Sequence, residues 1–274
     1  MNHERRRITI VSVLLLIGGL AFVIVPYLWI LLTAFKRPVD AAAVPPKIFS
    51  PISFRAWEEL LSGPFPASLA NSVIITVGTT VATLLIGVPA GYAFARGRFL
   101  GRRFLGGWLL FSRMMPPVIF IIPLFLFFHQ LRLINTYLGL VLAYMSGLLP
   151  FTVWMCASYF EDIPQEIEEA ARVDGASRMR AFITVVLPMA VPGVLTVGVL
   201  IAIASWSEYF IPFLLAGTGT NPATVGLVNY VGTNTIDWGA MAAASLTLVL
   251  PVVILTLFAQ RGMLRGLSAG AVKG

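Results

Sequence analysis

The chain has 274 residues, of which 58% are hydrophobic and only 11% are charged, and its mean hydropathy is +0.89. Because about a quarter of residues are charged in soluble domains, this composition excludes an ordinary soluble protein and indicates an integral membrane protein. The net charge of +7 does not predict nucleic-acid binding, since the basic residues are scattered over short loops instead of lining one face.

Six apolar segments are long enough to cross a bilayer as helices, which takes roughly 20 residues each. They cover residues 8–35, 69–95, 104–128, 137–159, 189–216 and 240–260. The first segment follows the basic stretch HERRR, but it is longer than a signal peptide's apolar region and has no clear cleavage site. We therefore expect a retained signal anchor and an all-α polytopic membrane protein with six transmembrane helices.

The positive charges predict the orientation of these helices, because Lys and Arg concentrate in cytoplasmic flanks. Thirteen of them fall on the side of the N-terminus and five on the other side. Both termini are therefore predicted to be cytoplasmic, which leaves two long outer connections, residues 36–66 and 217–239. The second contains no Lys or Arg and is either a plain solvated loop or a probe that docks into an external partner.

The densest charge lies in residues 161–188, called here the charged loop, between the fourth and fifth predicted spans. Glu166, Glu168 and Glu169 fit the N-terminal half of a short helix, where the backbone dipole favours negative charge. Pro164 suits the start of that helix. Glu168 is also spaced to pair with Arg172, four residues further on.

A second short helix is predicted after a tight turn in the same loop. Asp174–Gly175 predicts a helix stop, because glycine accepts the left-handed conformation found just past helix ends. Ser177 is placed to cap the next helix, which we expect to run to Pro188. Ala170 and Ala171 give the first helix a low apolar strip, and its acidic character fits a protein partner better than a lipid surface, which favours basic faces.

The stretch EAARVDG followed by VVLP resembles the EAA loop of binding-protein-dependent ABC importer permeases. The matching residues are Glu169, Ala170, Ala171, Gly175, Leu187 and Pro188, while Val185 replaces the usual isoleucine. Further pieces from residue 71 onward are similar to the carbohydrate branch, which includes maltose-type permeases. These pieces are MMPPVIFIIPLFLFF, INTYLGLVLAY, LPFTVWM, IPQEIEEAARVDGAS, SWSEYF and the terminal GLSAGAVKG.

The resemblance implies a type I ABC importer transmembrane fold in a bacterial cytoplasmic membrane. Residues 1–66 would form an N-terminal helix and outer loop, 67–260 the transmembrane domain with its coupling loop at 161–188, and 261–274 a cytoplasmic tail. The implied partners are a second homologous permease subunit, two cytoplasmic ATPase subunits that bind ATP and Mg²⁺, and an external solute-binding protein. No cofactor is expected in this chain.

The resemblance also implies roles for residues of the charged loop. Glu169 would be the polar contact with the ATPase, and Ala170 and Ala171 would form the close-packing surface. Asp174 and Gly175 would set the turn that fixes the angle of the loop. The imported solute would be a carbohydrate or a related polar molecule.

Two ionisable residues fall within predicted spans, where a central charge costs at least ~2.5 kcal/mol and usually faces a partner or a wet cavity. Glu208, beside Trp206 and Tyr209, either snorkels or pairs with a neighbouring helix, or it lines a translocation path, since aromatic faces and carboxylates suit sugar rings and hydroxyls. Arg113 either snorkels, pairs with Glu208 or meets an anionic substrate group.

Two other classes of function would show different sequence features from a permease subunit. An ion-coupled secondary transporter would typically show internal repeats and coupling groups at the midplane, and an intramembrane enzyme would gather a nucleophile, a base or metal ligands. The sequence shows no clear repeat and no phosphate-binding G-x-x-x-x-G-K-[ST] pattern. Its single cysteine, Cys156, and its two distant histidines do not predict a metal site.

Overall fold

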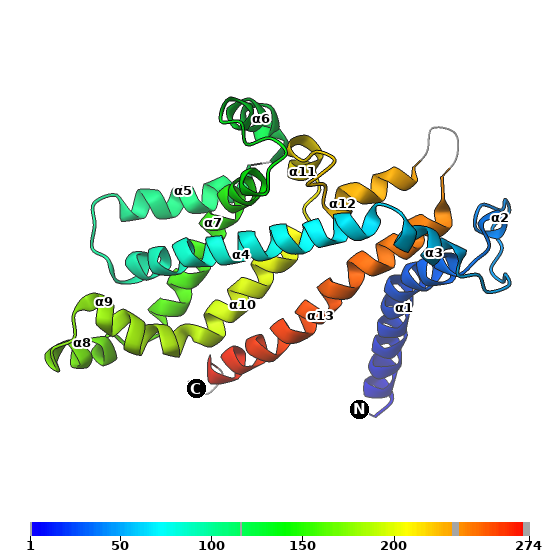
Figure 1. Ribbon diagram of the computed structural model, residues 1–274. Coiled ribbons are helices and arrows are strands. Elements are labelled where there is room, and N and C mark those ends of the chain that lie inside the picture. Colours follow the sequence, from blue (N-terminus) through cyan, green and yellow to red (C-terminus); the bar gives the residue numbers. More distant parts are fainter. Residues whose placement is uncertain (1, 116, 232–235, 271–274) are drawn as a thin grey trace. The chain divides into compact units, whose positions relative to one another are not determined.

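The computed structural model describes residues 2–115, 117–231 and 236–270, and regular structure in these ranges is helical apart from one bridge between Val231 and Ile236 (Figure 1). The chain divides into two compact units. The first, called unit 1, contains Met1–Pro66 and Gly226–Leu250, and the second, called unit 2, contains Ala67–Val225 and Pro251–Gly274.

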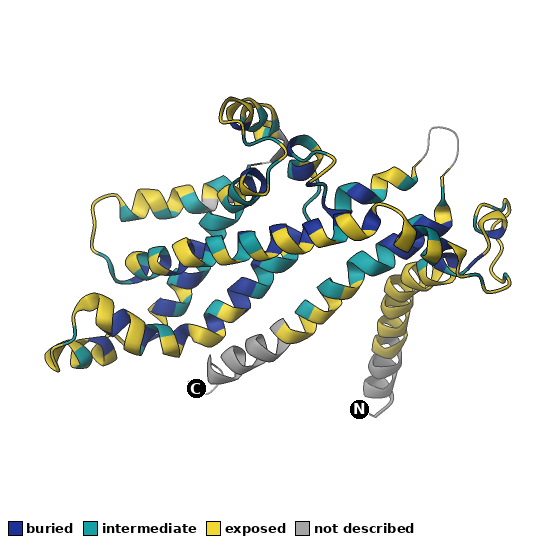
Figure 2. Cartoon of the chain, in the orientation of Figure 1, coloured by how far each residue is buried: buried dark blue, intermediate teal, exposed yellow. Residues whose placement is uncertain are grey.

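Unit 1 begins with α1 (Asn2–Ala34), which is apolar on every side after its charged first residues. From position 12 to position 29 all of its described side chains are exposed (Figure 2), which is the pattern of a helix that faces lipid. The elements of unit 1 that follow α1 are α2 (Pro38–Ala41), α3 (Arg55–Ser62), η3 (Leu227–Tyr230) and the first part of α13 (Trp238–Gly270). The ring of Phe35, just past α1, packs on Trp57 of α3 at 5.6 Å between centroids.

Unit 2 contains a bundle of longer helices around two apolar clusters. Its elements are α4 (Phe65–Arg96, from Ala67), α5 (Arg102–Met114), η1 (Pro117–Phe120), α6 (Ile121–Gln130), α7 (Tyr137–Glu161), α8 (Gln165–Val173), α9 (Arg178–Ala181), the π-helix η2 (Phe182–Val186), α10 (Leu187–Trp206), α11 (Phe210–Leu215), most of α12 (Ala223–Gly226) and the end of α13. One cluster includes the fully buried Cys156, Phe160 and Val197, and the other includes Leu140 and Leu215.

Among the described residues, five helical stretches are long and apolar enough to cross a membrane. They are Ser12–Ala34, Phe65–Arg96, Tyr137–Glu161, Arg178–Trp206 and Trp238–Phe258. These stretches confirm an all-helical polytopic membrane protein. They overlap five of the six predicted spans.

The third predicted span, residues 104–128, is wrong as one continuous helix. The chain forms α5, leaves helical geometry at Met115 and continues through η1 into α6. Met115 has φ −76° and ψ 129°, the extended conformation forced on a residue that precedes a proline, here Pro116. The continuous run of apolar residues concealed this interruption.

The fifth predicted span, residues 189–216, also has different bounds. The helical stretch begins at Arg178 and ends at Trp206, and a short break separates it from α11. The predicted end of the second loop helix at Pro188 is therefore wrong. Pro188 lies in the first turn of α10, where a missing N–H is tolerated, and the π-turn before it carries the helix through.

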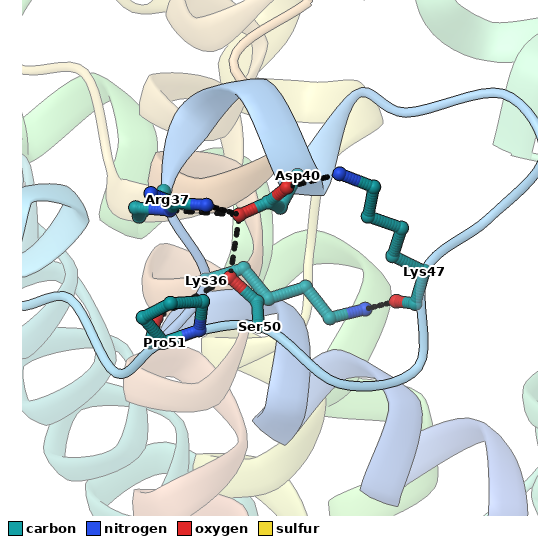
Figure 3. A network of polar contacts seen from close by, with 6 residues as sticks. All are labelled: Lys36, Arg37, Asp40, Lys47, Ser50 and Pro51. Carbon is teal, nitrogen blue, oxygen red and sulfur yellow. Dashed lines mark hydrogen bonds and ion pairs between the residues drawn. The ribbon is translucent and has the colours of Figure 1, made fainter.

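A network of polar contacts closes the loop after α1 (Figure 3). The carboxylate of Asp40, only 3% exposed, accepts hydrogen bonds from Lys47 at 2.7 Å and from Ser50 and Arg37 at 2.8 Å. These donors, Lys47 first, hold the pKa of Asp40 well below its usual range. Lys36 donates to the carbonyl of Lys47 at 2.6 Å, and burial lowers the pKa of its ammonium group.

Replacing Asp40 with asparagine is expected to speed amide hydrogen exchange at Ala41 and Ala42 severalfold at neutral pH, because the loop loses its ion pairs. The folded pKa of Asp40 lies below its unfolded value of about 3.9, so its stabilising effect is present above that pH and is lost as the pH falls below it. After correction for intrinsic exchange rates, exchange at these two amides should therefore speed up in the native protein as the pH falls below about 4. In the Asp40→Asn variant the corrected rate should not change over the same pH range. Glu59→Gln, which breaks only the exposed pair with Arg55, should exchange as the native protein does.

Candidate functional site

The turn in the charged loop is a complete helix-ending motif. Gly175, at φ +94°, donates its N–H to the carbonyl of Arg172 at 3.1 Å, and Ala176 donates to that of Ala171 at 3.0 Å. These two bonds define a Schellman motif, which needs a left-handed residue at the position of Gly175. The predicted helix stop is confirmed.

The start of each short helix also agrees closely with the sequence. Pro164 is the residue directly before α8. The hydroxyl of Ser177 accepts the N–H of Arg180 at 3.3 Å and caps α9, so the predicted cap is confirmed. Local signals over three to five residues therefore determine the shape of this loop.

Most of α8 is exposed, and the residues Glu169 and Ala170, which carry part of the resemblance, lie on its open surface (Figure 2). Glu169 and Ala170 are exposed and Ala171 is half-buried, while Asp174 and Gly175 are exposed at the turn. Val173 is 87% exposed on the same helix. An acidic group beside small and apolar exposed side chains is a surface suited to a protein partner.

Glu168 has a different environment from its neighbours, and its predicted pairing with Arg172 is wrong. It is 7% exposed and accepts hydrogen bonds from Tyr92 at 2.6 Å and Arg96 at 3.2 Å, both on α4. A partner more than 70 residues away has no local signature, so the i, i+4 spacing gave the wrong answer. Tyr92 and Arg96 are residues that sequence reasoning missed.

The residues predicted for a translocation path lie at the break after α10. Trp206 is buried, and Glu208 and Tyr209 are half-buried. One carboxylate oxygen of Glu208 accepts the N–H groups of Phe210 at 2.9 Å and Ile211 at 3.2 Å, so Glu208 caps the start of α11. This local capping explains how the chain tolerates a carboxylate among apolar helices.

Tyr209 and Arg113 complete the predicted path set. The ring of Tyr209 stacks on Phe213 at 5.5 Å. Arg113 belongs to α5, but its side chain lies outside the described residues. Its pairing with Glu208 therefore stays a prediction. Within the described part of the chain, no three His, Cys, Asp or Glu side chains gather as metal ligands.

The first part of the outer connection 217–239 lies within unit 2 and is held there by the side chains of Asn71, which is buried, and Asn135, which is exposed. Asn71 donates to the carbonyls of Gly219 and Asn221, and the carboxamide oxygen of Asn135 accepts from Gly217 and Thr220. A polar Asn71 at the start of an apolar helix is the signal that could have pointed to this contact. Residues 232–235 of the same connection lie outside the described ranges.

Comparison with known proteins supports the same interpretation. Residues 84–263 match the family described as "Binding-protein-dependent transport system inner membrane component". The chain is 33% identical over 257 residues to the trehalose transport system permease protein SugB of Mycobacterium tuberculosis, covering 92% of this chain and 93% of that protein. It is 32% identical over 270 residues to the trehalose/maltose transport system permease protein MalG of Thermococcus litoralis, covering 96% and 97%.

The fold matches a solved structure of a bacterial ABC transporter involved in the import of the acidic polysaccharide alginate. The TM-score is 0.80 at 26% sequence identity, over 93% of this chain and 96% of that chain. The fold and the sequence thus define the transmembrane subunit of an ABC importer. The chain belongs to the family of binding-protein-dependent transport system inner membrane components. It is a noncatalytic, multi-pass permease subunit. Membership of this family argues against the two alternative functions, an ion-coupled secondary transporter and an intramembrane enzyme.

Proposed function

We propose that this permease subunit imports a carbohydrate or a related polar solute delivered by an external binding protein. Relatives above 30% identity are named for trehalose, for trehalose and maltose and, at 34% identity over 272 residues, for diacetylchitobiose. The shared chemistry of these named solutes is a set of sugar rings and hydroxyl groups. That shared chemistry supports the solute class assigned to this chain.

The complex in this proposal has a second homologous permease subunit and two cytoplasmic ATPase subunits, which bind ATP and Mg²⁺. A solved neighbour at 18% identity and TM-score 0.66 is an alginate transporter in complex with a periplasmic protein that carries an alginate pentasaccharide. At that identity the likeness shows the fold alone. The proposal of an external binding protein for this chain therefore rests on the family.

The observation that carries the proposal is the shape of the charged loop. Its two short helices, the Schellman turn at Gly175 and the exposed surface around Glu169 and Ala170 are suited to a protein partner. We assign that partner as the ATPase, with Ala171 and Asp174 completing the surface. Nucleotide-driven closure of the ATPases would then move the membrane helices through this contact.

The topology in this proposal has six crossings and both termini in the cytoplasm. The third crossing would be made in two pieces by α5 and α6 on either side of the 115–120 interruption. Residues 1–66 would be the N-terminal helix and outer loop, and 67–260 the transmembrane domain. Residues 261–274 would be a cytoplasmic tail, of which the structure describes the backbone to Gly270.

Reconstitution of the native complex tests the function directly. Vesicles that contain this chain, its partner permease and the ATPases should take up labelled sugar only with ATP inside and the loaded binding protein outside. Omitting the ATPases should abolish uptake. Uptake by the membrane subunits alone, driven by an ion gradient, would overturn the proposal.

Glu208, Tyr209 and Trp206 are proposed to form part of the translocation path, together with Arg113 of α5. Glu208→Gln is expected to raise the sugar concentration at half-maximal uptake severalfold. The amide oxygen still caps α11, but the charge-assisted acceptor for hydroxyl groups is lost.

Transport assays and a measurement of folded protein check this prediction. Glu208→Ala removes the cap as well and should lower the folded amount in addition to uptake. If Glu208→Gln transports with unchanged affinity and rate, the residue has no part in the path.

A further inference from the structure

The charged loop is held to α4 by two side chains from the last two turns of that helix. The hydroxyl of Tyr92 donates to one carboxylate oxygen of Glu168 at 2.6 Å, and Nε of Arg96 donates to the other at 3.2 Å. Arg96 also donates through Nη2 to the carbonyl of Ile163 at 2.6 Å. The side chains of Tyr92 and Arg96 therefore bind α8 through Glu168, and Arg96 also binds the turn before α8.

This contact differs from the surface ion pairs of the chain in its burial. The side chains of Arg96 and Glu168 are 10% and 9% exposed, whereas Arg102 and Glu161 are 40% and 53% exposed. An exposed pair contributes little, because water screens it and the side chains lose entropy. Removing one member of a buried pair instead leaves an uncompensated charge, so substitution of Glu168 or Arg96 is expected to have a larger effect than substitution of an exposed partner.

Tyr92 is itself fixed by aromatic rings from both sides of the loop. Its ring lies 4.4 Å from that of Phe182 in η2 and 5.7 Å from that of Phe160 in α7, measured between centroids. Phe160 precedes α8 in the chain and Phe182 follows it. The entry and exit of the loop therefore meet at the same point of α4 that holds Glu168.

The geometry of α8 separates Glu168 from the partner surface. Successive residues of an α-helix point about 100° apart, so Glu168 and Glu169 cannot serve the same face. Glu168 faces α4 and is buried, while Glu169 and Ala170 are exposed. One face of α8 thus remains available for a partner while the other is tied to a membrane helix.

We propose that Tyr92, Arg96 and Glu168, called here the Glu168 anchor, transmit displacement of the charged loop to α4 during transport. Glu168 is a positioning residue that acts through α4 without touching the ATPase. This inference rests on the proposed function of the loop as the ATPase contact. It adds the route by which motion leaves the loop and enters the membrane helices.

The test measures sugar uptake per ATP hydrolysed in the reconstituted complex, together with the amount of ATPase that copurifies. Glu168→Ala should keep the ATPase bound, because the surface of Glu169 is intact, and should lower uptake per ATP at least tenfold. Glu168→Gln, which keeps an acceptor for Tyr92, should lower it less. Glu166→Ala removes an exposed glutamate from the same helix and should behave as the native protein does.

A structural role alone would reduce uptake and ATP hydrolysis in proportion, leaving their ratio unchanged, and that result would overturn the anchor. Loss of bound ATPase in Glu168→Ala would also overturn it, since Glu168 would then belong to the contact. Because the Gln variant preserves most of the local bonding, it decides the matter if the Ala variant does not fold.

A Glu169→Arg variant distinguishes failure of the anchor from failure of the proposed function. It should release the ATPase if the loop is the ATPase contact. If Glu169→Arg releases the ATPase while both Glu168 variants keep the native uptake per ATP hydrolysed, the Glu168 anchor alone would be refuted. Full binding and coupling in Glu169→Arg would refute the assignment of the loop.

A distance measurement tests the mechanical claim independently. Spin labels at two exposed positions, introduced by Ala93→Cys on α4 and Glu166→Cys on α8, should keep one separation in the nucleotide-free and nucleotide-trapped complexes. With Glu168→Ala added, the separation should change or broaden on trapping. A separation that changes equally with and without Glu168 would contradict the anchor.

Discussion

Replacing Gly175 with valine should reduce sugar uptake by at least tenfold while leaving membrane insertion intact. Gly175 has φ +94°, and a left-handed backbone costs an ordinary L-residue about 1–2 kcal/mol, with a β-branched side chain a clear outlier there. The cheapest relief is to abandon the Schellman turn, which changes the angle between α8 and α9. The proposed ATPase surface would then be presented in the wrong direction.

Uptake, ATP hydrolysis and copurified ATPase measured on one preparation check this expectation. Gly101→Val is the matched control, because Gly101 also has a positive φ, +85°, and open space around it, but lies outside the charged loop. Gly175→Asn should retain more activity than Gly175→Val, since asparagine tolerates the left-handed region better. Equal activity of the two valine variants would remove Gly175 from the coupling role.

The local shape of the charged loop could be predicted because its signals act within a few residues. Gly175 needs a positive φ, and Ser177 caps the helix that begins one residue later; each acts through its own backbone neighbourhood. The long apolar helices were predictable for a different reason, since lipid demands about 20 apolar residues and internally bonded backbone. Neither kind of signal involves a distant partner.

The features that could not be predicted depend on residues far apart in the chain. Arg172 is suitably spaced in sequence to pair with Glu168, and only the fold shows that Glu168 pairs with Arg96 instead. The interruption at Met115 had a visible cause in Pro116–Pro117, yet the apolar run around it favoured one helix. Window hydropathy reports the length of an apolar segment and is insensitive to where its backbone bends.

Close packing between α4 and α7 is another feature that the sequence did not predict, and it leads to a large expected effect. A Cβ atom added at Gly91 would lie 2.6 Å from Cβ of Cys156, 3.0 Å from the backbone nitrogen of Ala157 and 3.1 Å from the carbonyl oxygen of Val153. Two of these three atoms belong to the backbone of α7. Rotation of a side chain therefore cannot relieve the overlap, and the helices must separate.

Gly91→Leu should therefore lose most of its folded protein, and Gly91→Ala should be destabilised in the same direction by about 1–3 kcal/mol, the usual cost of overpacking. Folded yield and thermal stability in detergent measure both. Gly147 lies in α7 with no atom within 4 Å of the added Cβ, so Gly147→Ala should be neutral or stabilising, because alanine favours a helix over glycine by about 1 kcal/mol. The same chemical change is thus expected to destabilise the protein at Gly91 and not at Gly147. Equal stability of Gly91→Ala and Gly147→Ala would mean that α4 and α7 do not approach as closely as the structure places them.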